Sequence, residues 1–462
     1  MTDIVCVSPI DGREVARRKI ASPAEIDAAL GAARSAQSAW RRVPLAERAV
    51  LVGRFVDAML AMKDEIGPEL TLQMGRPSRY AAGELGGFEE RARYMIALAD
   101  EVLAPLVPAP KPGFTRMIRR EPVGIVFVIA PWNYPYLTAV NAVVPALMAG
   151  NAVLLKHAAQ TLLVGARYQQ AADAAGLPKG LFQWLVLGHA ETERILAAGA
   201  VDHVAFTGSV EAGRAIERAA AGTFTSIGLE LGGKDPAYVR ADADLKHAVE
   251  TVVDAAFFNS GQCCCGIERV YVHADVYDRF LKDAVALTNQ YVLGDPRAAE
   301  TTLGPMAQLR LAETVRQHCA DALGRGARAE IDTRAFAADK AGTPYLAPQI
   351  FTSVNHGMLV MNEETFGPVV GIMPVRDDAE AIRLMNDSRY GLTAALFTND
   401  TAAAEAIGAE LQTGTVFMNR ADYLDPGLAW TGVKETGRGA SLSRLGYDAV
   451  TRPKSYHFKH LG

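Results

Sequence analysis

The chain has 462 residues, of which 50% are hydrophobic and 21% are charged, and its formal net charge is -5 with a pI near 6.0. This composition is typical of a globular protein of two or three domains and excludes a disordered chain. The acidic balance argues against nucleic acid as a partner, because a polyanion is bound by a basic surface.

The sequence also predicts neither secretion nor membrane insertion. Residues 1–19 lack the basic segment, apolar core and cleavage site of a signal peptide. The most apolar region, residues 123–155, is interrupted by prolines and asparagines and is not a candidate membrane span. We therefore expect a protein of the reducing cytoplasm.

In chain order, the first hundred residues predict mainly helices, and an alternation of short β-branched runs with helical patterns follows. Such alternation is typical of a parallel sheet with crossover helices, and so of the α/β class. The first series predicts strands at 123–131, 151–156, 182–188 and 203–209, with helices at 137–150, 161–176 and 190–199. The second series predicts a helix at 245–256 and a strand at 269–276.

A phosphate-binding pattern lies at residues 205–220. A predicted strand ends at Phe206, Gly208 permits a tight turn and Ser209 can cap the next helix, whose free N–H groups attract anions. The pattern is not the G-x-G-x-x-G fingerprint, and by itself it also fits a helix cap without a ligand.

Other polar residues stand in constrained positions. Asn133 lies between two prolines, Glu230 is followed by two glycines after one intervening leucine, and Glu364 precedes Phe366 and a Gly-Pro turn. Each also fits a purely structural role.

Three of the five cysteines are consecutive, in the stretch "FFNSGQCCCG". Neighbouring side chains point in different directions, which argues against a metal site, and the few cysteines lack the spacing of a disulfide framework. Packing and nucleophilic reactivity remain as explanations.

Eight segments together resemble, in order, the motifs of the aldehyde dehydrogenase superfamily: "PWNYP", "LLK", "FTGSVEAG", "LELGGK", "FFNSGQCCC", "EETFGPV", "YGLTAALFT" and "TGVKETGRG". The resemblance implies an NAD(P)-binding domain of Rossmann type at 1–106 and 124–231, and a related α/β catalytic domain at 232–435. It also implies a small oligomerisation element at 107–123 and 436–462, hence a homodimer or homotetramer. The tail at 451–459 alternates like a strand, and we expect it to join a sheet across a subunit interface.

The resemblance assigns catalytic roles to Cys264 as nucleophile, Glu230 as general base, and Asn133 with the Cys264 backbone N–H as oxyanion hole. The implied reaction oxidises an aldehyde to the carboxylic acid with NAD or NADP, through a thiohemiacetal and a thioester. A CoA-acylating relative, an acyl-phosphate-reducing relative and a non-catalytic protein of the same fold are the alternatives, and the presence of Glu230 favours hydrolysis.

The resemblance likewise assigns cofactor contacts to Trp132, Lys156, Gly208, Ser209, Glu364 and Phe366. Ala159 stands where NAD-specific members often carry a glutamate, so either cofactor is expected. The implied substrate tunnel has a mixed aromatic and polar lining, comprising Tyr134, Leu137, Asn141, Phe258, Cys263, Cys265, Asp422, Leu424 and Trp430. Arg420 near this tunnel fits either a carboxylate-bearing substrate or a solvent-facing position. No metal is implied.

Overall fold

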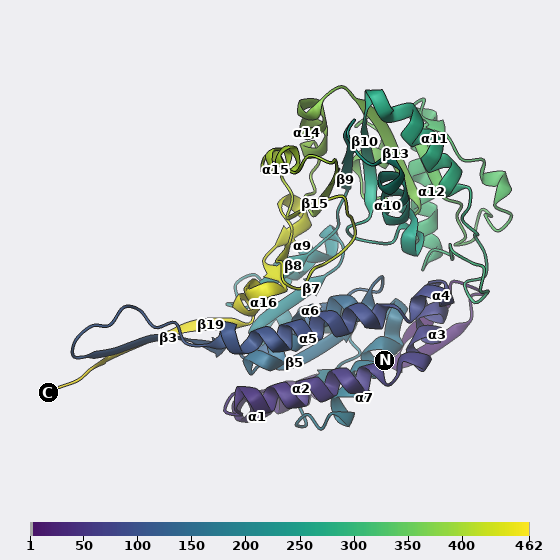
Figure 1. Cartoon of the computed structure of the whole chain (residues 1–462). Coiled ribbons are helices and arrows are strands. Elements are labelled where there is room, and N and C mark those ends of the chain that lie inside the picture. The colour runs from purple at the N-terminus through teal and green to yellow at the C-terminus, as the bar shows by residue number, and fades with distance from the viewer. Residues whose placement is uncertain (1–2, 462) are drawn as a thin grey trace.

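The structure is a computed structural model that describes residues 3–461. It has two α/β lobes, and the first is built around a six-stranded sheet (Figure 1). Five of its strands are parallel, and the edge strand β17 pairs antiparallel with β8. In spatial order the strands are β17 (Gly437–Arg438), β8 (Ser226–Glu230), β7 (His203–Thr207), β4 (Ile125–Ala130), β5 (Ala152–His157) and β6 (Phe182–Trp184). The strand order reverses between β4 and β7, where open α/β sheets bind ligands at their carboxyl ends.

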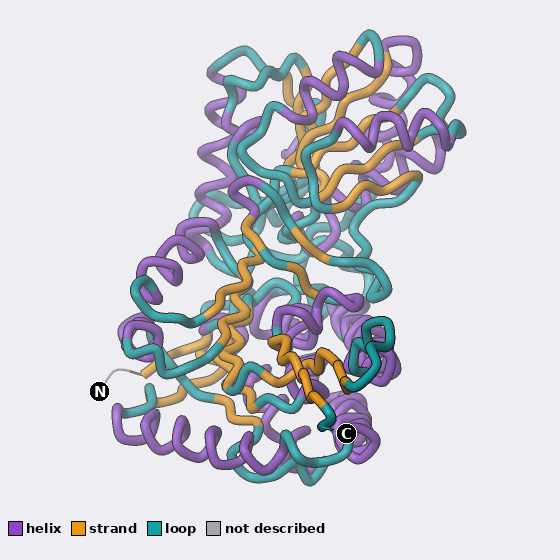
Figure 2. The backbone as a smooth tube through the Cα atoms, turned by 90° about the vertical axis from the view of Figure 1, so that its left-hand side faces the viewer, coloured by secondary structure: helices purple, strands orange, loops and turns teal. Residues whose placement is uncertain are grey.

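The second lobe has a seven-stranded sheet of related construction (Figure 2). Its strands are parallel except for the short edge strand β11. In spatial order they are β11 (Arg328–Ala329), β12 (Gln349–Thr352), β13 (Val369–Val375), β10 (Ile267–His273), β9 (Asp235–Val239), β14 (Thr393–Phe397) and β15 (Thr415–Met418). The α/β prediction is thus confirmed.

Helices cover both sheets and bury the strands between them. All six residues of β4 and all five of β9 are buried, as expected for parallel strands covered on both faces. The first lobe carries α1 (Pro23–Trp40), α2 (Leu45–Leu60), α3 (Lys63–Met74), α4 (Ser78–Ala81), α5 (Glu84–Leu103), α6 (Pro135–Ala149), α7 (Leu162–Ala174), α8 (His189–Ala197), α9 (Val210–Ala220) and α16 (Ser443–Ala449). The second carries α10 (Leu245–Phe257), α11 (Tyr277–Thr288), α12 (Leu309–Gly324), α13 (Leu359–Asn362), α14 (Asp378–Asn386) and α15 (Thr401–Glu410).

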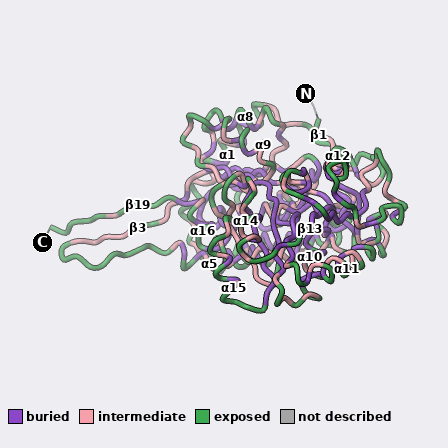
Figure 3. Tube along the Cα trace, turned by 90° about the horizontal axis from the view of Figure 1, so that it is seen from above, coloured by how far each residue is buried: buried purple, intermediate pink, exposed green. Residues whose placement is uncertain are grey.

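A two-stranded arm projects from the first lobe (Figure 3). Its strands β3 (Phe114–Pro122) and β19 (Thr451–Lys459) pair antiparallel over their whole length. The predicted strand at 451–459 is confirmed, and its partner is the segment before residue 123. Most of β19 is exposed, including about half of the Phe458 surface, whereas most of β3 is half-buried.

The segment between the second lobe and the arm returns to the first lobe. β17 extends the six-stranded sheet, and β18 (Ala440–Ser441) pairs with β16 (Trp430–Thr431). α16 then packs against α5 and α6. Only the last strand of the sequence-defined element 436–462 therefore lies in the arm.

Several predicted boundaries differ from the structure. The first hundred residues contain an unpredicted hairpin of β1 (Asp3–Val7) and β2 (Glu14–Lys19), whose sequence "EVARRK" is too polar to read as a strand. The strand predicted at 269–276 spans Ile267–His273, because residues 274–276 turn into a short 3-10 helix. Among residues 3–461, no helix combines the length and apolarity needed to cross a bilayer.

Candidate active site

The residues singled out by sequence gather where the two lobes meet. The first lobe contributes carboxyl ends of strands: Asn133 follows β4, and Glu230 is the last residue of β8. The second lobe contributes amino ends: Cys264 precedes β10, and Phe366 precedes β13. The two sheets therefore present opposite edges to one shared cleft.

The three thiols do not share one environment. Cys264 is half-buried, whereas Cys263 and Cys265 are buried, with their sulfur atoms 3.5 Å apart. Both flanking sulfur atoms lie within hydrogen-bond distance of Oδ1 of Asp422, at 3.2 Å from Cys263 and 3.4 Å from Cys265. The expectation that these adjacent thiols would point apart fails for Cys263 and Cys265, because Cys264 and Cys265 lie in a turn that the Gly266 N–H closes on the Cys263 carbonyl at 3.1 Å.

The arrangement favours ionisation of the central thiol. Hydrogen bonds from Cys263 and Cys265 lower the pKa of Cys264, although burial and the charges of Asp235 and Glu230 oppose this effect. The hydrogen bond to Cys264 raises the pKa of Cys263 to about 12. Of the three thiols, Cys264 is the one whose pKa its surroundings lower, whereas the pKa values of Cys263 and Cys265 are raised.

Asn133 is fixed from several sides. Its Nδ2 donates to the Gln262 carbonyl at 3.2 Å, which leaves its second amide hydrogen for a ligand. The backbone carbonyl of Asn133 accepts hydrogen bonds from Nδ2 of Asn259 at 3.3 Å and from the Arg76 guanidinium. Arg76 is also ion-paired with Glu84, and both side chains are almost fully buried.

The Arg76–Glu84 pair was not found from the sequence. Arg76 donates to Oδ1 of Asn259 at 3.1 Å, while Oε1 of Glu84 accepts the backbone N–H groups of Tyr136 and Leu137 at the start of α6. The pair thus joins the Asn133 turn to the segment before Cys264. Arg76 lies in the loop between α3 and α4 and Glu84 begins α5, and no local sequence pattern indicates that the two are paired.

Glu230 is held by two hydroxyl groups. Thr207 Oγ1 donates to Oε2 at 3.0 Å, and Ser441 Oγ donates to Oε1 at 2.5 Å. Burial raises the pKa of Glu230, and the two hydroxyl hydrogen bonds act in the opposite direction. A cavity of about 410 Å³ lies beside the carboxylate and is lined also by Asn141 and Thr138.

The two glycines after Glu230 permit close backbone contact. A Cβ on Gly233 would lie 2.5 Å from the Cys264 carbonyl oxygen, and a Cβ on Gly232 would lie 2.3 Å from Oε2 of Glu364. The Gly233 N–H donates to Oε1 of Glu364 at 2.9 Å. Burial raises the pKa of Glu364 to about 8.

A second buried ion pair, Lys234–Glu268, was also missed. Its atoms are 2.5 Å apart, and Glu268 accepts the backbone N–H groups of Thr365 and Phe366 at 2.8 and 2.9 Å. The pair therefore fixes the turn that carries Glu364 and Phe366. A glutamate inside β10, a strand whose residues are nearly all buried, was a signal that could have revealed it.

Four of the residues predicted to bind the cofactor, Trp132, Lys156, Gly208 and Ser209, lie at the carboxyl edge of the first sheet, and Glu364 and Phe366 come from the second lobe. Lys156 is half-buried in β5, and Ser209 is the exposed N-cap of α9, where its hydroxyl accepts Ala212 N–H at 3.3 Å. Trp132 and Phe366 come from different lobes, and their rings lie edge to face with centroids 5.7 Å apart.

This edge fits a nicotinamide dinucleotide. A Cβ on Gly208 would lie 2.7 Å from the Phe206 ring, so this position suits a residue without a side chain. The start of α9 presents the partial positive charge that attracts a pyrophosphate.

The predicted tunnel residues occupy different positions around the thiols. Tyr134 is stacked under Arg76, whose guanidinium carbon is 4.7 Å from the ring centre. Trp430 is buried in β16. Phe258 contacts the Tyr80 ring and lines a separate recess of about 330 Å³.

The remaining tunnel candidates differ in exposure. Leu137 lies on the first turn of α6 against α5, where a Cβ on Gly87 would touch it, and Leu424 packs at the edge of the first-lobe core. Arg420 is exposed and stacks on Tyr423 at 3.7 Å from its ring centre.

The doubly wound first sheet, the helix start at its switch point and the thiol between the lobes define a class of α/β oxidoreductase with a cysteine nucleophile. A sequence model described as "Aldehyde dehydrogenase family" matches residues 1–456. The chain belongs to this family, as its motifs indicated, and it is an NAD(P)-dependent enzyme that oxidises aldehydes.

Individual relatives show the range of the family. The chain is 36% identical over 455 residues to 4,4'-diapolycopene aldehyde oxidase from a Methylomonas species, covering 95% of this chain and 82% of the relative. It is 33% identical to succinate-semialdehyde dehydrogenase [NADP(+)] from Mycobacterium avium, covering 98% and 96%. Betaine aldehyde dehydrogenase from Staphylococcus aureus, solved with NAD+, superposes with a TM-score of 0.92 at 27% identity, covering 99% and 92%.

Proposed function

We propose that this enzyme converts its aldehyde to a free carboxylic acid, with Cys264 as nucleophile, Asn133 as oxyanion donor and Glu230 as hydrolytic base. The observation that carries the proposal is the meeting of Cys264, Asn133 and Glu230 between the carboxyl edge of one sheet and the amino edge of the other. We divide the chain accordingly into a cofactor domain (1–106 and 124–231), a catalytic domain (232–435) and an oligomerisation element (107–123 and 436–462).

The first step is attack of the Cys264 thiolate on the aldehyde carbon, which forms a thiohemiacetal. Hydrogen bonds from the flanking thiols, which lower the Cys264 pKa, support this role. The charge that develops on the aldehyde oxygen requires donors. The free amide hydrogen of Asn133 and the backbone N–H of Cys264 supply them.

When bound, a nicotinamide cofactor would supply the hydride acceptor, and Cys264 would then carry the acyl group as a thioester. Trp132, Lys156, Gly208, Ser209, Glu364 and Phe366 would hold this cofactor, and the position of the first four at the carboxyl edge of the first sheet supports that assignment. Ala159 is exposed at the end of β5, where no carboxylate repels a 2′-phosphate, so both NAD and NADP are expected to bind.

Glu230 then takes a proton from water, which attacks the thioester carbonyl and releases the acid and the thiol. The burial-raised pKa of Glu230 suits a base near neutral pH, and the adjacent cavity gives water a place to approach. A CoA-acylating or acyl-phosphate enzyme would not need this base. Its presence beside the cavity favours hydrolysis over transfer to another acceptor.

The tunnel is proposed to comprise Tyr134, Leu137, Phe258, Cys263, Cys265, Asp422 and Trp430. The relatives named above act on aldehydes as different as a carotenoid aldehyde and succinate semialdehyde, so their substrates do not converge on one candidate. Because Arg420 stacks on Tyr423 at the surface, we do not assign it to a substrate carboxylate.

Homo-oligomerisation through the arm and a cytoplasmic location complete the proposal. The arm leaves a long antiparallel pair uncovered, which is a ready interface for a second copy. All five cysteines are free, and a thiol nucleophile is retained best in a reducing compartment.

A panel of aliphatic, aromatic and carboxylate-bearing aldehydes, each with NAD and NADP, tests the proposal. We expect reduced nicotinamide and free acid in equal amounts, without added CoA or phosphate. Turnover that requires CoA or phosphate would replace hydrolysis by acyl transfer, and absence of turnover with every aldehyde would favour a binding protein. Light scattering that finds an active monomer would contradict the role of the arm.

A further inference from the structure

Beside the proposed nucleophile, two thiols and a carboxylate converge from distant parts of the chain. The sulfur atoms of Cys263 and Cys265 and a carboxylate oxygen of Asp422 all lie within 4.8 Å of one another. Cys263 and Cys265 are buried and Asp422 is half-buried. The proposed mechanism uses none of the three as a reacting group, so their convergence needs its own explanation.

The separations resemble the edges of a small coordination tetrahedron. Zinc binds sulfur at about 2.3 Å and oxygen at about 2.0–2.2 Å, so its neighbouring ligand atoms are roughly 3.5–3.8 Å apart. Here the two sulfur atoms are 3.5 Å apart, and the sulfur-to-oxygen distances are 3.2 and 3.4 Å. An ion would need to move these atoms outward by only a few tenths of an ångström.

The donor set selects a soft cation. Two thiols and one carboxylate match zinc or cadmium, whereas magnesium and calcium prefer ligands that are all oxygen. The Tyr134 hydroxyl is buried without a hydrogen-bond partner among residues 3–461. Burial raises its pKa, and Cys263 and Asp422 are close enough to add to this effect. The fourth ligand of the ion would therefore be a water molecule or this hydroxyl.

We infer that Cys263, Cys265 and Asp422 form a site for one thiophilic divalent cation, Zn²⁺ or Cd²⁺, that reversibly inhibits the enzyme. Binding forms two metal–sulfur bonds and one metal–oxygen bond, and it releases the two thiol protons to solvent. Coordination removes the hydrogen bonds that favour the Cys264 thiolate, and the ion lies in the proposed tunnel. Both effects oppose turnover.

The test uses the full-length protein after treatment with a chelator. Cd²⁺ is titrated in while the ultraviolet absorption of cadmium–thiolate bonds is recorded, and bound cadmium is counted after gel filtration. In a Cys264→Ser background, which removes the nucleophile as a competing ligand, we expect one ion per chain. Because binding is measured without catalysis, failure of the proposed function leaves this test intact.

Serine variants isolate the soft ligands. Cys263→Ser or Cys265→Ser, added to Cys264→Ser, keeps a hydrogen-bond donor to Asp422 but should weaken Cd²⁺ binding at least about tenfold. Asp422→Asn should weaken it similarly, and the distant Cys319→Ser should not change it. Circular dichroism verifies that each variant is folded, and if Asp422→Asn fails to fold, the serine variants decide.

Inhibition gives the second readout. Turnover of the wild-type enzyme should fall on addition of Zn²⁺ and return fully with a chelator. Cadmium binding that is lost in Cys264→Ser alone, or that survives Cys263→Ser unchanged, would place the ion on the nucleophile instead. If no cadmium–thiolate absorption appears at micromolar Cd²⁺, the three residues form only a hydrogen-bonded packing arrangement, and the proposed metal site is wrong.

Discussion

The two sheets of this protein contribute to the candidate active site through opposite edges. In the first lobe, the carboxyl ends of β4 and β8 lead to Asn133, which donates to the Gln262 carbonyl, and to Glu230, which lines a cavity. In the second lobe, the cleft is reached by the segments before β10 and β13. The rule that open α/β sheets bind ligands at their carboxyl ends therefore describes one sheet of the two.

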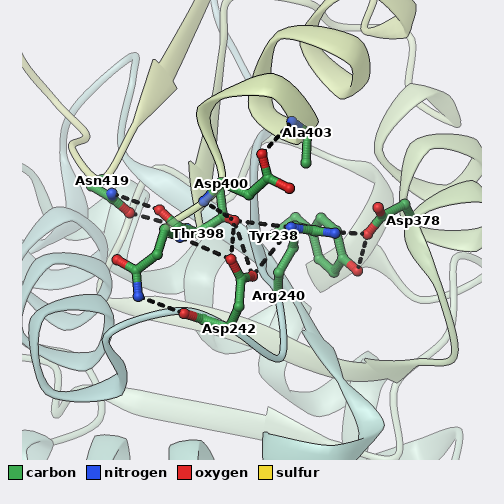
Figure 4. Close-up of polar contacts among 9 residues, drawn as sticks. Tyr238, Arg240, Asp242, Asp378, Thr398, Asp400, Ala403 and Asn419 are labelled. Atoms are coloured by element: carbon green, nitrogen blue, oxygen red, sulfur yellow. Dashed lines mark hydrogen bonds and ion pairs between the residues drawn. The ribbon is translucent and has the colours of Figure 1, made fainter.

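The carboxyl edge of the second sheet is closed by polar groups that bind one another (Figure 4). Arg240, which follows β9, donates to Asp378 at 3.0 Å and to the Thr398 hydroxyl at 3.0 Å. Thr398, which follows β14, donates to Asp242, and its backbone exchanges two hydrogen bonds with the Asn419 amide. Side chains paired in this way have little capacity left for a ligand.

The comparison indicates that strand direction alone does not decide where chemistry occurs. At the first sheet's carboxyl edge, Asn133 keeps one free amide hydrogen, and Glu230 faces a cavity. At the second sheet's carboxyl edge the equivalent groups are satisfied internally. The following changes test this contrast, from the largest expected effect to the smallest.

Cys264→Ser should lower kcat by about 10³-fold or more, because a hydroxyl without a strong base is a poor nucleophile. Cys263→Ser and Cys265→Ser are the matched controls. They keep donors to Asp422 and should retain substantial activity. Steady-state kinetics in the absence of divalent metals measures all three, and a dead Cys263→Ser enzyme with an active Cys264→Ser enzyme would reassign the nucleophile.

Glu230→Gln should slow thioester hydrolysis by about 10²-fold while affecting hydride transfer less, since the amide keeps the shape but cannot accept a proton. A burst of reduced nicotinamide should precede slow turnover, and intact-mass analysis should detect the acyl adduct on Cys264. Normal steady-state acid release from unmodified enzyme would remove Glu230 from the proposed role.

Ser441→Ala tests how the base is tuned. The Ser441 hydroxyl donates to Glu230 and favours its charged form, so its loss should raise the Glu230 pKa further. A base with a higher pKa is protonated at higher pH, and because Glu230 acts in the hydrolytic step, the acid limb of the kcat profile should move upward. At neutral pH the loss should reach up to about tenfold. Ser441→Thr keeps the donor and should restore the profile, whereas an unchanged profile in Ser441→Ala would exclude this coupling.

Much of this arrangement was predictable because local patterns and ordered motifs define it. The buried strand before Asn133, the cap at Ser209 and the reactive position of Cys264 each depend on neighbours in sequence. Contacts between distant segments were not predictable. Arg76 meets Asn259 across 183 positions, Ser441 meets Glu230 across 211, and Cys263 meets Asp422 across 159.

The one wrong physical argument concerned the adjacent thiols. It considered only that neighbouring side chains diverge, and it neglected that a turn can bring the first and third of three consecutive residues together. No local pattern indicated that Asp422 would meet Cys263 and Cys265.

Ala159→Glu probes the open carboxyl edge of the first sheet at the end of β5. Ala159 is exposed, and a new carboxylate near the adenosine ribose would repel a 2′-phosphate by about 1 kcal/mol, roughly a fivefold change. The variant should therefore lose kcat/KM with NADP about fivefold more than with NAD. Ala159→Gln, of similar size but uncharged, is the control. An equal change with both cofactors would show that residue 159 does not face the ribose.

Asp378→Ala tests the closed edge and should have the smallest effect on catalysis. Asp378 accepts hydrogen bonds from Arg240 and from the Tyr238 hydroxyl at 3.0 and 2.8 Å, but its side chain is 39% exposed. Water can replace part of what is lost, so the free energy of unfolding should fall by only about 1 kcal/mol. Because this edge takes no part in the proposed chemistry, kcat/KM should stay within about twofold of wild type under conditions where both proteins are folded. Chemical denaturation and steady-state kinetics measure the two quantities separately. A large loss of kcat/KM without loss of stability would mean that the second sheet also uses its carboxyl edge for function, and the contrast between the two lobes would not hold.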